Sequence, residues 1–189
     1  MFAYCKNCPV GNTDTRGNRP EWCLIICDGG STSQPEPKDI TKEFTELMRI
    51  HANQLVNHLF LSWMDYSDKY SIDEAYEKAF MDTRWFFAQQ VKTNGEWDLK
   101  NGKVYPYYEE FVFNGQVVNG QDLGNIHYGF VGASVIPKES ILHFFAGMYQ
   151  IISGTKREYA FWYFDEPRDY DMIEYGFNLY YEDRYGYGG

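Results

Sequence analysis

The chain has 189 residues, and its 17 lysines and arginines against 27 aspartates and glutamates give a formal net charge of -10. This length suits one domain with a single core. The acidity disfavours tight binding to nucleic acid, because cationic contacts to phosphate supply most of the non-specific affinity. No apolar run reaches the roughly 18 residues of a membrane span. The first residues, MFAYCKNCPVG, lack a secretory signal, so we expect any export to use a specialised secretion system.

All four cysteines lie near the start of the chain, at Cys5, Cys8, Cys23 and Cys27. Two close pairs separated by a loop fit a structural zinc site with four thiolate ligands. Two disulfides, typical of proteins outside the cytoplasm, fit the same spacing, and free thiols are the third alternative. The stretch GGSTSQPEPK that follows is typical of a linker. We therefore expect a Cys-rich arm and linker at residues 1–38 and a folded domain at residues 39–189.

Helical periodicity predicts two helices in the first half of the folded domain. The first runs from Asp39 or Thr41 to about residue 64. The second begins with a capping box of Ser71 and Glu74 and runs to about residue 92, where Asn94–Gly95 stops it.

Between Trp97 and Val135 the signals are those of short strands and hairpins. Asn101, Asn114 and Asn119 each precede glycine, the strongest short-range sign of a hairpin turn. A third helix is predicted from residue 137 to 153, and a fourth from 167 to 181 before a loose tail. The expected fold is α+β, mainly α-helical with a small β-hairpin or sheet element.

The acidic residues at the start of the fourth helix allow two interpretations. Asp165 is the expected N-cap, and carboxylates there stabilise the helix dipole. Alternatively, Asp165 and Asp169 lie four residues apart and would share a helix face, as paired catalytic carboxylates or ligands of a divalent cation must. Arg168 between them would neutralise one charge.

Other polar residues of catalytic type occur in the middle of the chain. His127 lies in GNIHYG, where the glycines predict a tight turn or the end of a strand. His127 is a candidate general base, and the alternative is a packed, hydrogen-bonded histidine. Asn125 and Tyr128 beside it would orient a substrate, or else Asn125 supplies only the turn geometry. His51 and His58, seven residues apart on the first helix, form only a weak candidate metal pair.

The segment from Trp97 to Lys100 follows the second helix. A buried Trp97 with Asp98 capping the turn explains it. The alternative is a loop that presents Trp97, Asp98 and Lys100 to a substrate.

Four ordered segments resemble the bacterial polymorphic toxin type 44 domain over about residues 75–180. They are VKTNGEWDLK, QDLGNIHYGFVG, AGMYQIISGT and DEPRDYDMIEYGF. The chain departs from the family at Glu166, where a second Asp is usual, and by extra residues between Tyr108 and Gly124. The polar positions that recur in the family fall here on Asp98, Asp122, Asn125, Tyr128, Asp165 and Asp169.

The resemblance implies a toxin that competing bacteria deliver through a secretion system and that an immunity protein neutralises. One hypothesis for its chemistry is a hydrolase acting on peptidoglycan or its precursor in the target periplasm, since aromatics are 19% of the chain and sugars stack on them. The second is an RNase or DNase acting in the target cytoplasm, which would use His127 with Lys100 or Arg168. The third is a non-enzymatic, aromatic-rich binding module.

Overall fold

The computed structural model describes residues 3–5, 8–10, 36–99, 104–142 and 167–185 of the chain. The chain divides into two units, Met1–Glu36 and Pro37–Gly189. In the first unit, β1 (Ala3–Cys5) pairs antiparallel with β2 (Cys8–Val10), which places the backbones of Cys5 and Cys8 opposite each other. Cys23 and Cys27 lie outside the described residues, so zinc and disulfides both stay predictions.

None of the described helices is long and apolar enough to cross a membrane.

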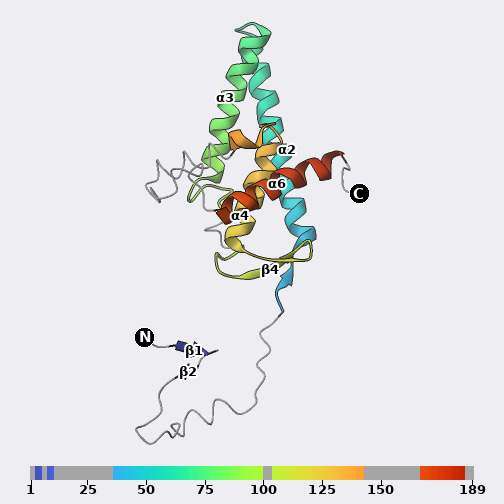
Figure 1. Cartoon of the computed structure of the whole chain (residues 1–189). Helices are drawn as coiled ribbons and strands as arrows, with labels where there is room; N and C mark the ends of the chain where they lie inside the picture. Colours follow the sequence, from blue (N-terminus) through green and yellow to red (C-terminus); the bar gives the residue numbers. More distant parts are fainter. Residues whose placement is uncertain (1–2, 6–7, 11–35, 100–103, 143–166, 186–189) are drawn as a thin grey trace, which may run out of the picture. The chain divides into compact units, whose positions relative to one another are not determined.

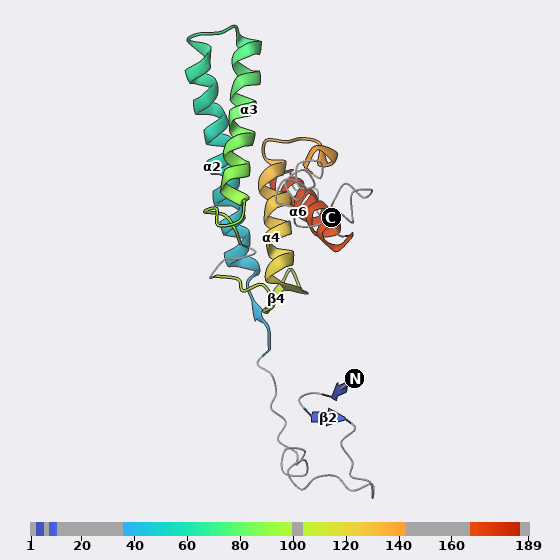
Figure 2. The same cartoon turned by 90° about the vertical axis from the view of Figure 1, so that its left-hand side faces the viewer.

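The second unit begins with an antiparallel helical hairpin of α2 (Thr41–Ser67) and α3 (Ile72–Val91), as Figures 1 and 2 show. Both helices were predicted and are confirmed. The capping box of Ser71 and Glu74 is present at the start of α3, and Asn94 after its end has a left-handed φ of 63°. Small residues at four-residue spacing, Ala75 and Ala79, are buried on α3 and let it approach α2 closely.

A small sheet lies at the other end of α2. β3 (Lys38–Asp39) pairs in parallel with β4 (Glu110–Phe113), which pairs antiparallel with β5 (Gln116–Asn119). The predicted turn at Asn114 is confirmed: Asn114 and Gly115 have φ of 50° and 75°, as a tight hairpin turn requires. The predicted mainly helical fold with a small sheet is therefore confirmed for the described residues.

The prediction of strands throughout residues 97–135 is wrong for its second half. Residues 120–133 form a helix, α4 (Gly120–Ala133), and the segment VYPYY forms bends and a turn. Asn119, expected to start a hairpin turn, is instead the N-cap of α4. The glycines that suggested turns are helical and buried, because α4 is enclosed by neighbouring elements.

The last helix, α6 (Pro167–Tyr185), begins where predicted but extends four residues further than expected. Its final turn is held to α2, since Arg49 Nε donates to Asp183 Oδ2 at 3.0 Å. Of the predicted helix at 137–153, residues 139–142 are helical and the rest lies outside the described part of the chain.

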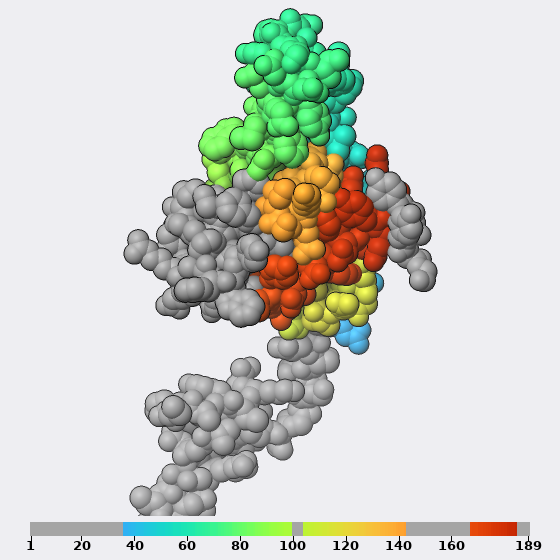
Figure 3. Space-filling view, turned by 45° about the horizontal axis from the view of Figure 1, so that its top comes forward, coloured from blue at the N-terminus to red at the C-terminus, as the bar shows by residue number. Residues whose placement is uncertain are grey.

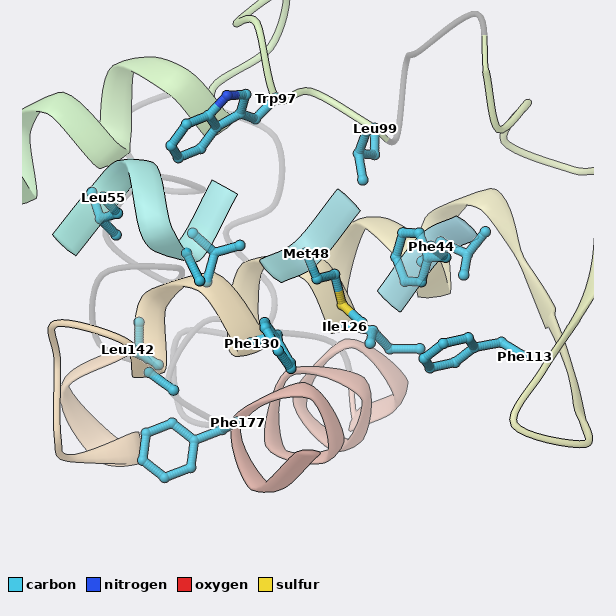
Figure 4. Packing of buried hydrophobic residues seen from close by; sticks show 14 of the residues in the cluster. Phe44, Met48, Leu55, Trp97, Leu99, Phe113, Ile126, Phe130, Leu142 and Phe177 are labelled. Carbon is cyan, nitrogen blue, oxygen red and sulfur yellow. The ribbon is translucent and has the colours of Figure 1, made fainter. Parts of the chain in front are cut away.

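The core of this unit lies around α4. Its apolar residues pack against α2 on one side and α6 on another, and Figure 4 shows Met48 of α2 pointing toward Ile126 of α4. The crossing of α4 and α6 is unusually close. A Cβ added to Gly129 would overlap the Ile173 carbonyl oxygen, and one added to Gly176 would overlap that of Ile126. This approach brings the polar residues of the two helices together.

Candidate functional site

The first turn of α4 fixes one buried carboxylate. Asn119 Oδ1 accepts a hydrogen bond from the Asp122 backbone N–H, and Asp122 Oδ2 accepts one from the Asn119 N–H, both at 2.9 Å. This reciprocal capping box satisfies two N–H groups at the helix start. Asp122 itself is only 1% exposed, so its position is set by α4.

Arg168 at the start of α6 pairs with this carboxylate. Its Nε donates to Asp122 Oδ1 at 2.7 Å and its Nη2 to Oδ2 at 2.6 Å, a two-pronged, charge-assisted contact. The Asp122 hydrogen bond raises the pKa of Arg168, which remains cationic. The predicted neutralising role of Arg168 is thus directed at Asp122 rather than at its neighbours on α6.

Asp169, the next residue, is held by neutral amides. Gln121 Nε2 donates to Asp169 Oδ1 at 2.9 Å, and Asn125 Nδ2 donates to the same oxygen at 2.6 Å. Asp169 is 5% exposed and Asn125 is 2% exposed. The two amides therefore orient the Asp169 carboxylate through Oδ1, and neither of them donates to Oδ2. We call Asp122, Asn125, Arg168, Asp169 and Gln121 the α4–α6 cluster.

A second polar group lies between α2 and α4. His51 Nδ1 and His127 Nε2 are 2.7 Å apart, and the His51 ring stacks on Trp97 with centroids 4.5 Å apart. Burial lowers the pKa of His127 to about 3, helped by repulsion from His51, and burial lowers the pKa of His51 to about 4. Both rings are therefore neutral at physiological pH, so that one donates to the other.

The structure does not bring all the predicted site residues together. His127 is in a helix rather than in the expected turn, and it lies two residues, or about 200° of helix rotation, from Asn125. It therefore faces α2, whereas Asp122 and Asn125 face α6. With 1% exposure, His127 itself has no direct access to solvent.

Three other predicted residues have structural contacts. Trp97 is buried at 4% exposure, and Asp98 Oδ2 accepts from the Asn94 N–H at 2.8 Å, as the turn-capping interpretation expected. Tyr128 donates its hydroxyl to the Leu142 carbonyl at 3.1 Å and stacks on Phe87. Asp165 and Lys100 lie outside the described residues, and their roles stay predictions.

Sequence reasoning missed Gln121 and the partnership of His51. Gln121 precedes Asp122 on α4, and recognising this helix would have placed it one turn from Asn125. No local pattern identifies His51 as the partner of His127. Among the described residues, no group of three or more His, Cys, Asp or Glu is arranged to hold a metal ion.

The α4–α6 cluster lies in the part of the chain that resembles a known protein family. A family model described as Bacterial toxin 44 matches residues 86–182, which is more than half of the chain. No curated protein and no solved structure shows a significant match. The matched range contains all of the α4–α6 cluster and His127, whereas His51 on α2 lies before it.

Proposed function

The chain belongs to the Bacterial toxin 44 family, and on that premise we propose that this bacterial toxin is a hydrolase of peptidoglycan or its precursor, with Asp169 as a catalytic carboxylate. The proposal includes delivery by a secretion system, action in the periplasm of the target cell and neutralisation by an immunity protein.

The buried, amide-held carboxylate of Asp169 is the observation that carries the proposal. Glycoside hydrolysis uses two carboxyl groups in different surroundings, one exchanging a proton and one remaining ionised. Asp122, paired with the Arg168 guanidinium, suits the ionised role. Asp169 receives its hydrogen bonds from uncharged donors and lies next to the exposed Arg168. The two carboxyl groups therefore have different hydrogen-bond partners, one a guanidinium and the other two amides. Asp165 is a further candidate for the second carboxyl.

The alternative of an RNase or DNase is less well supported. The chain carries a formal net charge of -10, which repels phosphate. His51 and His127 add no positive charge at neutral pH, since burial holds both of their pKa values well below 6.5.

Growth of a bacterium expressing the chain, with and without a periplasmic signal peptide, tests the proposal. We expect killing only from the periplasm and its loss in Asp169→Asn, which keeps the size and one acceptor oxygen of the side chain. Asp171→Asn is the matched control, because Asp171 is exposed on the same helix and its change should leave killing intact. Killing from the cytoplasm alone would favour a nuclease, and no killing in either compartment would favour a binding module.

A further inference from the structure

A turn with two exposed tyrosines precedes β4. The Glu109 backbone N–H donates to the Pro106 carbonyl at 3.0 Å, so Tyr107 and Tyr108 are the two central residues of the turn. Their rings meet edge to face, with centroids 4.7 Å apart and planes at 76°. Tyr107 is 37% exposed and Tyr108 is 88% exposed, so the core does not account for the position of Tyr108.

This turn is fixed against the first turn of α4. Gly120 packs so closely on the carbonyl oxygens of Tyr105 and Pro106 that an added Cβ would overlap both. Gly120 directly precedes Gln121, which donates to Asp169. Burial raises the pKa of Tyr107, and the charges of Asp169 and Asp122 add to this effect. The tyrosine turn therefore lies beside the α4–α6 cluster, and Figure 3 shows α6, in red, bordering the yellow segment that precedes α4.

We propose that Tyr107 and Tyr108 form a carbohydrate-stacking subsite that holds one sugar ring of a glycan chain next to Asp169. The inference rests on the proposed function and names the part of the site that binds substrate. The C–H groups on the face of a pyranose pack on an aromatic ring, while the phenol hydroxyls and the polar side chains nearby meet the sugar hydroxyls.

The surroundings of the turn favour a glycan over a stacked nucleobase. Aromatic rings also stack on bases, but such sites combine stacking with a basic groove for the phosphates. Within the part of the chain that the structure describes, the charged groups that act on Tyr107 are the carboxylates of Asp169 and Asp122, and Asp122 is paired with Arg168. The rings of a glycan chain carry hydroxyls and have no phosphate at every residue, so a glycan backbone meets less of this repulsion than a nucleic acid does.

Co-sedimentation of the full chain with purified sacculi tests the subsite. The Asp169→Asn background keeps the wall intact during the measurement. On it, we expect Tyr108→Ala to weaken retention about three- to tenfold, which is the range for loss of one aromatic stacking contact. Tyr108→Trp should retain binding, because it keeps an aromatic face. Tyr76→Ala, at a tyrosine 49% exposed on α3, is the matched control and should bind like the parent.

Equal retention of the parent and the Tyr108→Ala variant would overturn the subsite, and so would a parent that does not bind sacculi. Tyr108-dependent binding to a single-stranded oligonucleotide instead of sacculi would overturn the glycan assignment. Release of soluble wall fragments by the unmutated chain tests the proposed function separately from the subsite. Release that is insensitive to Tyr108→Ala leaves the hydrolase standing without the subsite. Tyr108-dependent binding without release leaves the subsite standing without the hydrolase.

Discussion

At the residue scale, Asp169 joins two helices as well as serving as the proposed catalytic group. Its Oδ1 accepts from two buried or half-buried amides of α4. A carboxylate in this position therefore contributes to stability, and a substitution designed to test catalysis must preserve an acceptor. Loss of killing in an alanine variant could come from lost catalysis or from lost stability, and the measurement would not separate the two.

We expect Asp169→Ala to lower the free energy of unfolding by about 1–3 kcal/mol, because two amide N–H groups lose their acceptor. Asp169→Asn keeps an oxygen for them and should cost clearly less. Urea unfolding of both variants measures the difference. Equal stability of Asp169→Ala and the unmutated chain would show that these hydrogen bonds contribute nothing to folding.

The contact between Asp122 and Arg168 gives a second prediction at this scale. Arg168→Ala removes the two guanidinium hydrogen bonds to the Asp122 carboxylate, which is 1% exposed, and we expect a loss of about 1–3 kcal/mol in unfolding free energy. Arg184→Ala, at an exposed arginine on the same helix, should change stability by less than about 0.5 kcal/mol. Similar losses in the two variants would contradict a specific role for the Arg168 contact.

The histidine pair predicts how stability depends on pH. In the unfolded chain a histidine has a pKa of about 6.5, whereas His51 and His127 have pKa values of about 4 and about 3 in the fold. The unfolded state thus binds more protons between these values. The stabilisation is fully present above about pH 7 and is lost as pH falls toward 3, by roughly 1–3 kcal/mol per pH unit for the two groups together.

Urea unfolding at pH 7, 6 and 5 measures this dependence. We expect His51→Gln to flatten it, because one of the two titrating groups is removed. Asn53→Ala, at an exposed position on the same helix, should keep the slope of the unmutated chain. A slope unchanged in His51→Gln would contradict the assignment to the pair.

At the element scale, the close crossing of α4 and α6 positions the whole α4–α6 cluster. Gly129 and Gly176 allow it because each faces a backbone carbonyl of the other helix at a distance that no side chain fits. Two helices held this close place Asn125 and Gln121 within hydrogen-bond reach of Asp169. The glycines of α4 are therefore packing residues and not the hinge of a turn.

We expect Gly129→Ala to destabilise the fold by about 1–3 kcal/mol or more, since the added methyl must displace the backbone of α6. In an exposed helix the same change would stabilise by about 1 kcal/mol. Gly115→Asn is the control, because nothing lies within 4 Å of its Cβ position and Asn tolerates the left-handed backbone there. Thermal unfolding compares the two variants, and a Gly129→Ala protein as stable as the unmutated chain would contradict the close crossing.

At the scale of the molecule, the family match covers fewer residues than the folded unit: the match spans residues 86–182, and the unit spans Pro37–Gly189. The match begins at residue 86, near the end of α3, yet the core extends into α2 through Phe44, Met48, Ala52 and Leu55. His51 on α2 also contacts His127. The matched residues alone would therefore expose a large apolar surface and His127 without its partner His51.

We expect a fragment of residues 72–189, which lacks α2, to show no cooperative unfolding transition. A fragment of residues 37–189 keeps the whole second unit and should unfold cooperatively. Circular dichroism during urea titration distinguishes them. Cooperative unfolding of the shorter fragment would show that α2 is dispensable for the fold.

The sequence by itself determined the features that depend on neighbouring residues. The start of α3 follows from Ser71 and Glu74, the hairpin turn from Asn114–Gly115, and the family from four short segments. Caps and tight turns are local, because the groups that stabilise them lie within four residues of one another. The identities of Asp122, Asn125 and Asp169 as polar sites were also visible, through the resemblance.

Only the tertiary structure decided how those polar residues are grouped. Glycine and asparagine around residues 119–132 indicate turns by local preference, and packing against α2 and α6 overrides it to form α4. The partners of the polar residues are distant: Asn125 and Asp169 are 44 positions apart, Asp122 and Arg168 are 46, and His51 and His127 are 76. Contacts over such separations depend on how close two helices approach, which no local pattern encodes. For that reason one predicted site became two groups on opposite faces of α4.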